Sequence, residues 1–198
     1  MHKLCLALRP EYKLGEKIAS GGTSTVWTVY DANNSLKIMR LKKFDEQEVE
    51  FLQSHNNSVN MQNKFSSVGV SPNLFDSWIC RLNGTVNAVT IMEDSGQPLY
   101  SFNDLNKDNL TRVLDVVTDM VNFIHKHGWY HGDIHQSNVT LKQVDRLGGG
   151  FYINLPNGLY RVYLIDTDLS GELWFAHYNL IEDDMKLTEM RLELLDFE

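Results

Sequence analysis

The sequence predicts an α+β protein in which mainly strands are followed by mainly helices. Short apolar and β-branched runs, separated by the turn clusters SGGTS and DANN, occupy the first third of the chain. Beyond residue 98, apolar residues at a period near 3.6 predict one long helix, and a second helix is expected close to the C-terminus. The change falls near residues 93–98 and predicts two lobes within a single domain, residues 1–198.

Each element is expected from its local pattern. The charged segment 42–55 predicts an amphipathic helix, residues 56–73 predict a loop or a ragged helix end, and Asp108 or Asn109 can cap the long helix. The pair Asn83-Gly84 is typical of a hairpin turn between two strands. Strands are expected at 14–19, 25–30, 35–39, 74–81, 86–92, 139–144, 151–155 and 160–165.

Composition narrows the classes of partner. A chain of 198 residues with 42% hydrophobic content can bury a core, and its net charge of −8 argues against nucleic-acid binding. A basic protein surface suits this charge better. Cys5 and Cys80 lack metal-ligand spacing and are expected to be reduced thiols of a cytoplasmic protein. No apolar run reaches membrane-spanning length, so no membrane association is expected.

The segment HGDIHQSN carries the strongest chemical signal. It places Asp133 and Asn138 five residues apart after a predicted helix, and Asp166 follows the apolar run YLI. A carboxylate in such a loop can accept the proton of an attacking hydroxyl, while the amide and the second carboxylate can hold a metal ion. This pattern predicts phosphoryl transfer from ATP with magnesium, in which Asp133 is the catalytic base and Asn138 and Asp166 are metal ligands.

In this order, the motifs make nearly the whole chain similar to the protein kinase superfamily. The resemblance implies a bilobal fold: a small β-rich N-lobe at about 11–92, a hinge at about 93–97 and a reduced, mainly helical C-lobe at about 98–198. It also implies ATP and Mg²⁺ as cofactors. Only about thirty residues follow Asp166, which makes this a truncated kinase without the usual peptide-binding helices; Asp183 or Asp184 is expected to begin one helix that braces the catalytic loop.

The segment EKIASGGTSTVW resembles the glycine-rich loop that covers the nucleotide phosphates. Ala19 and Ser24 replace its first and third glycines, so an ordinary hairpin turn remains the alternative. The resemblance also assigns Met92 to the gatekeeper and residues 93–95 to the hinge, whose backbone would bind adenine. The cofactor-binding residues expected from these segments are Ala19, Gly21, Gly22, Val26, Met92, Glu93 and Ser95.

The segment Leu36-Lys37-Ile38 resembles the strand that carries the phosphate-binding lysine. A lysine between apolar neighbours on a strand needs an anionic partner if it points inward. Family spacing gives Glu48 as that partner, with Glu46 and Glu50 as rivals, and a solvated acidic helix face is the alternative.

Departures from the family pattern refine the resemblance. Gly132 replaces the arginine that reads an activation-loop phosphate, so control by such phosphorylation is not expected. His135 replaces the usual lysine, and it either contacts the transferred phosphate as a catalytic residue or is structural. The HGDxHxxN form resembles aminoglycoside and choline kinases, whereas IDTDLSGEL, with Thr167 in place of phenylalanine, resembles haspin-type atypical kinases. His131 is expected to be a structural hydrogen-bonding residue.

The resemblance implies a minimal Ser/Thr protein kinase that acts on a protein substrate with a basic surface. An activating partner protein would complete its reduced C-lobe, and a cytoplasmic location, including a host cytosol for a viral or secreted protein, is expected. A small-molecule phosphotransferase and a kinase-like binding protein, a pseudokinase or decoy, are the alternatives. The eroded glycine loop favours the last of these.

Overall fold

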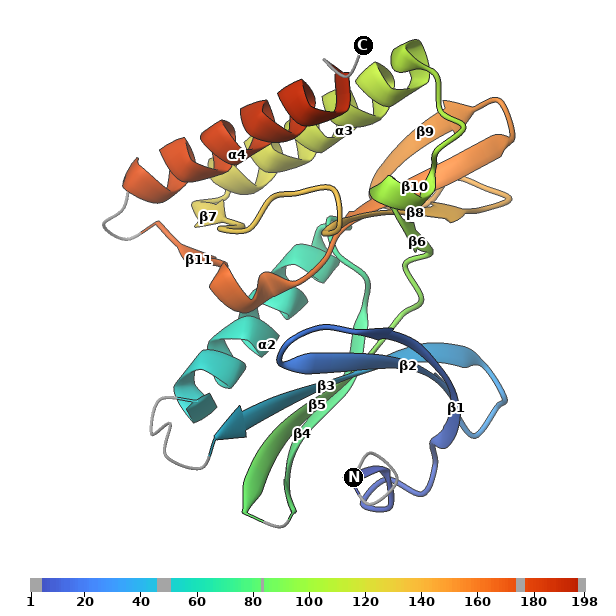
Figure 1. Cartoon of the computed structure of the whole chain (residues 1–198), viewed down its shortest axis with the longest axis vertical. Coiled ribbons are helices and arrows are strands. Elements are labelled where there is room, and N and C mark those ends of the chain that lie inside the picture. Colours follow the sequence, from blue (N-terminus) through green and yellow to red (C-terminus); the bar gives the residue numbers. More distant parts are fainter. Residues whose placement is uncertain (1–4, 46–50, 83, 174–176, 196–198) are drawn as a thin grey trace. The chain divides into compact units, whose positions relative to one another are not determined.

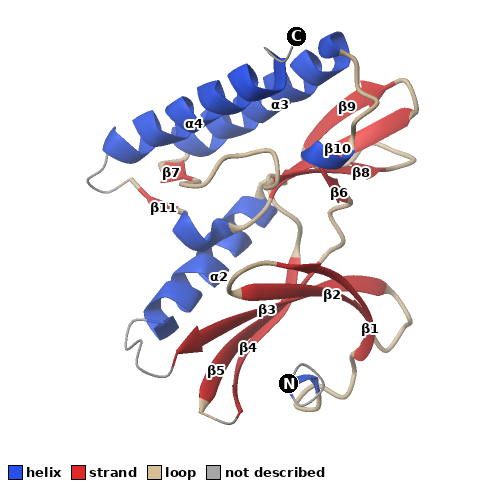
Figure 2. Cartoon of the chain, in the orientation of Figure 1, coloured by secondary structure: helices blue, strands red, loops and turns tan. Residues whose placement is uncertain are grey.

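The computed structural model describes residues 5–45, 51–82, 84–173 and 177–195. They form two compact units: unit 1 comprises residues 1–59 and 73–94, and unit 2 comprises residues 60–72 and 95–198. The boundary falls inside the helix α2 (Phe51–Ser67) and again after Asp94. Unit 1 is built around one sheet and unit 2 around two helices and a smaller sheet, so the predicted α+β class is confirmed (Figures 1 and 2).

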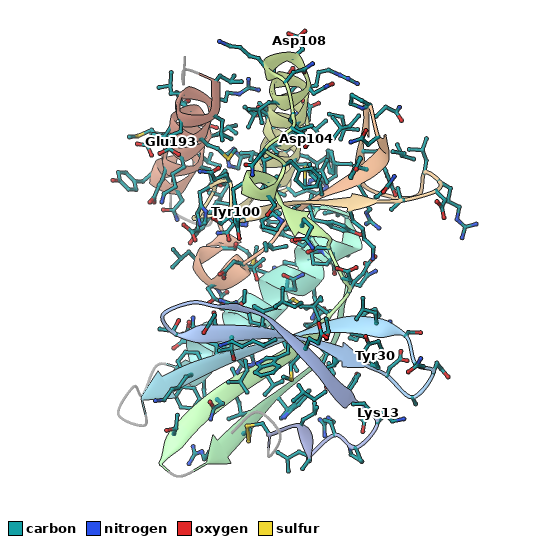
Figure 3. The ribbon with its side chains drawn as sticks, turned by 45° about the vertical axis from the view of Figure 1, so that its right-hand side comes forward. Lys13, Tyr30, Tyr100, Asp104, Asp108 and Glu193 are labelled. Atoms are coloured by element: carbon teal, nitrogen blue, oxygen red, sulfur yellow. A yellow bond between two sulfur atoms is a disulfide. The ribbon has the colours of Figure 1, made fainter. Side chains whose placement is uncertain are left out.

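Unit 1 contains an antiparallel sheet of five strands in the order β1-β2-β3-β5-β4 (Figure 1). Lys13 and Tyr30, labelled in Figure 3, are paired at the open end of the β1–β2 hairpin. Except for β3, which continues past its predicted end at Met39, these strands lie close to the predicted ranges, because turn residues bound the apolar and β-branched runs that form them. Their bounds are β1 Lys13–Ser20, β2 Ser24–Tyr30, β3 Leu36–Asp45, β4 Leu74–Leu82 and β5 Thr85–Met92.

Both faces of this sheet are covered by apolar packing. Met39 and Leu41 of β3 are buried with Cys5 and Leu6 from the N-terminal segment on one face. On the other face, Phe44 is buried together with Phe51 of α2, and their rings lie 5.5 Å apart. Because side chains alternate along a strand, residues 37, 39 and 41 share the first face, and residues 38, 40, 42 and 44 share the second.

The helix α2 corrects two predictions. β3 continues to Asp45, where the helix was predicted, and residues 56–67 are regular helix where a loop or a ragged helix end was predicted. The buried side of α2 includes polar side chains that contact the protein: His55 lies 2.9 Å from the Ser77 hydroxyl, and Gln62 donates to the carbonyl of Pro72 at 2.6 Å. A prediction that counts apolar residues alone therefore underestimates the length of this helix.

The two cysteines are paired. Cys5 and Cys80 form a disulfide across 75 residues, so the prediction of two reduced thiols is wrong. Their spacing in sequence did not indicate this, because the pairing depends on how the N-terminal segment packs on β4. Disulfides are rare in reducing compartments. The bond therefore bears against the expected cytoplasmic location.

In unit 2, the helices α3 (Lys107–Lys126) and α4 (His177–Leu195) lie side by side (Figure 1). The apolar stripe of α3 is buried as its period predicted. Its N-cap is Asn106, whose side chain accepts from the backbone N–H of Asn109, so the helix begins slightly before the predicted cap.

A four-stranded antiparallel sheet in the order β6-β8-β10-β9 completes the core of unit 2, together with a short ladder of β7 and β11. Two 3₁₀ turns, η1 (Leu99–Ser101) and η2 (Thr167–Leu169), connect these elements. In the described part of the chain, no helix has the length and apolar character that a membrane span requires. The strand bounds are β6 Gln97–Pro98, β7 Trp129–Tyr130, β8 Val139–Gln143, β9 Phe151–Leu155, β10 Gly158–Leu164 and β11 Gly171–Glu172.

Candidate active site

The strand pairing of unit 2 brings the two predicted metal ligands to one place. Val139 at the start of β8 pairs with Leu164 at the end of β10, and the backbone N–H of Ile165 donates to the carbonyl of Asn138 at 2.9 Å. Asn138 and Asp166 therefore leave the same end of the hairpin. Asp166 has φ 64° and ψ 74°, a left-handed conformation that is strained for a residue other than glycine. Such strain is often retained at functional sites.

The side chain of Asn138 links the catalytic loop to its carboxylate. Its Nδ2 lies 2.9 Å from the carbonyl of Asp133, 3.0 Å from Asp133 Oδ2 and 2.9 Å from His135 Nε2. The Asn138 amide donates to the two Asp133 oxygens, whereas the donor in its contact with His135 depends on the tautomer of that ring. These contacts fix the orientation of the amide and place its Oδ1 on the side away from Asp133. The structure therefore brings Asp133, His135 and Asn138 together as the sequence predicted.

A lysine that sequence reasoning missed also reaches this carboxylate. Lys186 of α4 places its Nζ 3.9 Å from Asp133 Oδ1, while His135 Nε2 lies 3.4 Å from Asp133 Oδ2. Asp133 keeps 30% of its side chain exposed. It is thus held between two basic side chains and remains open to an incoming hydroxyl. Only the packing of α4 against the loop reveals Lys186, because more than fifty residues separate it from Asp133 in sequence.

Asp183 fixes the backbone of the catalytic loop. Its fully buried carboxylate accepts from the backbone N–H groups of His131 at 2.8 Å and Gly132 at 2.7 Å, and it lies 3.0 Å from His125 Nε2. The predicted brace is therefore present, but α4 begins at His177, before the predicted start. The side chain of Asp183, rather than the helix terminus, makes the contact.

The glycine at position 132 is required by the structure. Gly132 has φ 82°, and a Cβ there would lie 2.6 Å from the carbonyl oxygen of Leu169. Neither an arginine nor any other L-residue fits this conformation without strain. The same segment is tied to the loop by Ser170, whose hydroxyl donates to the carbonyl of His131 at 2.8 Å. The residues after Asp166 therefore pack directly against the loop that carries Gly132.

His131 is a buried, neutral hydrogen-bonding residue. Its Nδ1 accepts from the backbone N–H of Asp133 at 3.3 Å, so its proton lies on Nε2, which donates to the carbonyl of Ile165 at 3.0 Å. The imidazole thereby joins the loop to the residue before Asp166. Burial lowers the pKa of His131 below its usual value of 6.5, although the neighbouring carboxylate of Asp183 acts in the opposite direction.

This lowered pKa predicts acid sensitivity. Below pH 6.5 the unfolded chain binds a proton at His131 that the folded chain does not bind until its own lower pKa is reached. We therefore expect the unfolding free energy to fall as pH drops below 6.5, with a slope from this group of at most about 1.4 kcal/mol per pH unit. Urea unfolding between pH 5 and pH 8 measures this slope. The same series on His131→Gln should lose that component, and an unchanged slope would contradict the assignment.

The predicted nucleotide-binding residues of unit 1 divide between two faces of the sheet. Val26 pairs with Arg40 and therefore lies on the α2 face. Lys37 lies on the opposite face; its Nζ is 3.6 Å from Asp31 Oδ2 and 4.4 Å from the ring centre of Phe75. Val26 and Lys37 cannot both face one nucleotide from a single flat sheet.

The turn between β1 and β2 is tight and open. The backbone N–H of Gly21 donates to the carbonyl of Ser24 at 2.8 Å, and a Cβ added at Gly22 would meet no atom within 4 Å. Neither glycine has a positive φ, so neither backbone strain nor packing explains them. Their small size leaves the backbone of the turn accessible. Ala19 and Ser20 are the last residues of β1, and they pair with Val26 and Thr25 of β2.

The predicted hinge begins where β5 ends, at Met92. The backbone N–H of Glu93 donates to the carbonyl of Asn73 at 2.8 Å, and the Asn73 amide donates to the Glu93 carboxylate at 2.9 Å. Residues 93–96, including Ser95, have no regular secondary structure. Glu48 and its rivals Glu46 and Glu50 lie outside the described residues, so the predicted partner of the lysine is not located.

The donor atoms of unit 2 fit magnesium. Asp166 supplies carboxylate oxygens and Asn138 an amide oxygen, which are the hard ligands that Mg²⁺ prefers, and Mg²⁺ commonly completes its shell with water and phosphate oxygens. Among the described residues, no group of three or more His, Cys, Asp or Glu side chains is placed to hold a metal ion. A site for a metal held mainly by nitrogen or sulfur, such as structural zinc, therefore finds no support in this part of the chain.

Comparisons with known proteins agree with this geometry at a coarse level. No family profile matches the chain. It is 25% identical over 144 residues to a probable serine/threonine-protein kinase of Clostridium acetobutylicum, a match that covers 70% of this chain and 21% of that protein. The chain thus spans about a fifth of the length of this curated relative. The similarity indicates a distant relationship to protein kinases.

Proposed function

We propose that this protein is a minimal ATP- and Mg²⁺-dependent protein kinase that phosphorylates serine or threonine. The observation that carries the proposal is the convergence of Asp133, Asn138 and Asp166, with His131 and Asp183 holding the loop that presents them. The distant similarity to a probable Ser/Thr kinase supports the same class of reaction. A protein whose role is only to bind would not need this arrangement of acid and amide groups.

In the proposed reaction, the acceptor hydroxyl oxygen attacks the γ-phosphorus of ATP. The new bond joins that oxygen to phosphorus, the bond from phosphorus to the β,γ-bridging oxygen breaks, and ADP leaves. Asp133 orients the hydroxyl and accepts its proton. Asn138 and Asp166 would hold magnesium, which neutralises charge on the phosphates when bound. Lys186 places positive charge beside Asp133, near the proposed position of the anionic phosphoryl group, and His135 adds a hydrogen-bonding side chain there.

A protein acceptor suits the chain better than a small molecule. The distant relative is a probable serine/threonine-protein kinase by its printed name, which supports a protein acceptor. The net charge of −8 favours an acceptor with a basic surface. The cytoplasmic location expected from the sequence conflicts with the Cys5–Cys80 disulfide and is not part of the proposal. The test of location is whether this disulfide persists when the protein is isolated from its native compartment under thiol-blocking conditions.

Transfer of label from [γ-³²P]ATP tests the acceptor class. The protein is incubated with Mg²⁺ and either basic proteins such as histones or a panel of aminoglycosides and choline, beside its Asp133→Asn form. Label on protein serine or threonine that disappears in Asp133→Asn is the expected result. Label on small molecules alone would favour a small-molecule phosphotransferase, and nucleotide binding with no transfer to any acceptor would favour a kinase-like binding protein.

A further inference from the structure

We propose that Arg40, and not Lys37, is the cation of unit 1 that binds the nucleotide phosphates; this rests on the proposed function. The register of β2 and β3 runs from Ser24↔Lys42 to Tyr30↔Leu36 without a shift. Cross-strand partners project from the same face of a sheet. Val26 and Arg40 are such partners, so the residue expected to contact the base and the guanidinium share one face.

The same face continues across the sheet and is the one that α2 covers. Arg40 pairs with Thr90 of β5, and Thr90 pairs with Ser77 of β4. The Ser77 hydroxyl lies 2.9 Å from His55 Nε2 of α2. The row from Val26 through Arg40 and Thr90 to Ser77 therefore crosses four strands on one face of the sheet, and Ser77 at its end contacts α2. Lys37 does not belong to this row, because side chains alternate along β3 and residues 37 and 40 therefore lie on opposite faces of the sheet.

Lys37 has an environment of its own on the other face. It pairs with Val29, which is fully buried in the cluster of Met39, Leu41 and the N-terminal residues. Its ammonium group meets Asp31 and the ring of Phe75. An ion pair and a cation–π contact account for this lysine without a nucleotide.

Arg40 also has suitable chemistry and position. A guanidinium presents several N–H donors in a planar fork that binds phosphate oxygens bidentately. The glycine turn lies next to this part of the sheet, because the carbonyl of Thr23 accepts from the backbone N–H of Lys43 at 2.8 Å. Lys42 shares the face but places its Nζ 5.1 Å from the ring centre of Phe44. Arg40 is thus the basic residue paired directly with Val26.

Nucleotide binding by matched variants tests this assignment. We expect Arg40→Met to weaken MgATP binding about tenfold or more, with little change for adenosine, which lacks phosphates. Arg40→Lys should retain part of the affinity, and Lys37→Met and Lys42→Met should bind within about twofold of the unchanged protein. Isothermal titration measures the affinities, and circular dichroism with thermal unfolding checks that each variant is folded.

The outcomes separate this assignment from the proposed function. Loss of MgATP binding in Lys37→Met or Lys42→Met, with Arg40→Met unaffected, would overturn the role of Arg40 and leave the kinase proposal standing. Equal losses for MgATP and adenosine in Arg40→Met would also overturn it, because the effect would not involve phosphates. Failure of the unchanged protein to bind MgATP would defeat the proposed function and this assignment with it.

A separate observation concerns the outer side of α4. Four large apolar side chains are exposed along it: Tyr178 at 75%, Ile181 at 55%, Met185 at 58% and Leu192 at 55%. Their spacing of three, four and seven residues places them on one stripe of the helix. The opposite side is buried, with Asp183, Leu187 and Met190 facing the core of unit 2. A stripe of this kind is typical of a surface that binds another helix.

The charges beside the stripe indicate what binds it. A shallow hollow at Ile181 and Met185 is bordered by Asp184, Thr188 and Glu189. Glu182 lies next to Ile181, whereas Arg191 donates to Asp115 and Thr118 of α3. Glu193 also stands along α4 (Figure 3). A second copy would bring carboxylates against carboxylates, which disfavours a dimer of this chain through α4.

We infer that the α4 stripe binds an amphipathic helix of a partner protein whose apolar side is flanked by lysine or arginine. A synthetic 18-residue helical peptide with a leucine stripe and lysine flanks is the probe, and a peptide with glutamate flanks is its matched control. Fluorescence anisotropy should show at least about tenfold tighter binding of the lysine peptide. The double variant Ile181→Ser, Met185→Ser should lose that binding and keep its fold.

Binding that survives in the double variant would overturn the inference, because it would then depend on general charge alone. Equal binding of both peptides, or binding of neither, would overturn it too. Light scattering of the protein without peptide tests whether the stripe instead joins two copies of this chain. A dimer that the double variant dissociates would assign the stripe to a second copy.

Discussion

Phosphoryl transfer is expected to fall about a thousandfold when Asp166 is replaced by Asn. Asn tolerates the left-handed backbone conformation of residue 166, so the substitution removes the negative charge with little change in backbone strain. The loss of charge would weaken the magnesium site proposed at Asp166 and Asn138. Initial rates measured over a range of Mg²⁺ concentrations should show both a lower maximum and a higher Mg²⁺ requirement.

The control for this substitution is Asp145→Asn, which makes the same chemical change at an exposed position. It should leave the rate and the Mg²⁺ dependence unchanged. A rate for Asp166→Asn within about tenfold of the unchanged protein would show that Asp166 does not hold the catalytic metal.

The second large effect is expected at Asp183. Replacing it with Ala leaves the buried N–H groups of His131 and Gly132 without their acceptor and removes the partner of His125. We expect the unfolding free energy to fall by about 3–5 kcal/mol, and phosphoryl transfer to be lost because the catalytic loop is no longer held. Urea unfolding monitored by circular dichroism measures the stability change.

The neighbouring Asp184 provides the matched control, because it is exposed on α4. Asp184→Ala should change the unfolding free energy by no more than about 0.5 kcal/mol. A loss below about 1 kcal/mol in Asp183→Ala would contradict the role assigned to its buried carboxylate.

Elements with a clear local period could be predicted from the sequence. The strands of unit 1 follow from short apolar and β-branched runs between turns, and the buried stripe of α3 follows from the 3.6-residue period. The proximity of Asp133 and Asn138 was also predictable, because they lie close in sequence, and the pairing of β8 with β10 then brings Asp166 to the same end of the strands. Fold class and the central residues of unit 2 thus depend on short-range information.

The features that were missed depend on tertiary packing. The buried side of α2 carries His55 and Gln62, whose polar contacts hide it from a count of apolar residues. The Cys5–Cys80 bond joins segments that only the fold brings together. The face of Lys37 follows from strand register rather than from its neighbours in sequence. Lys186 reaches Asp133 only because α4 packs beside the loop.

The central claim is that Asp133 and its neighbours transfer phosphate. Its most direct test is the initial rate of label transfer from [γ-³²P]ATP to protein serine or threonine with Mg²⁺, measured beside Asp133→Asn. We expect transfer by the unchanged protein and a loss of about a thousandfold in the variant, with MgATP affinity retained. Transfer at equal rates by both proteins, or no transfer by either to any protein acceptor, would contradict the account.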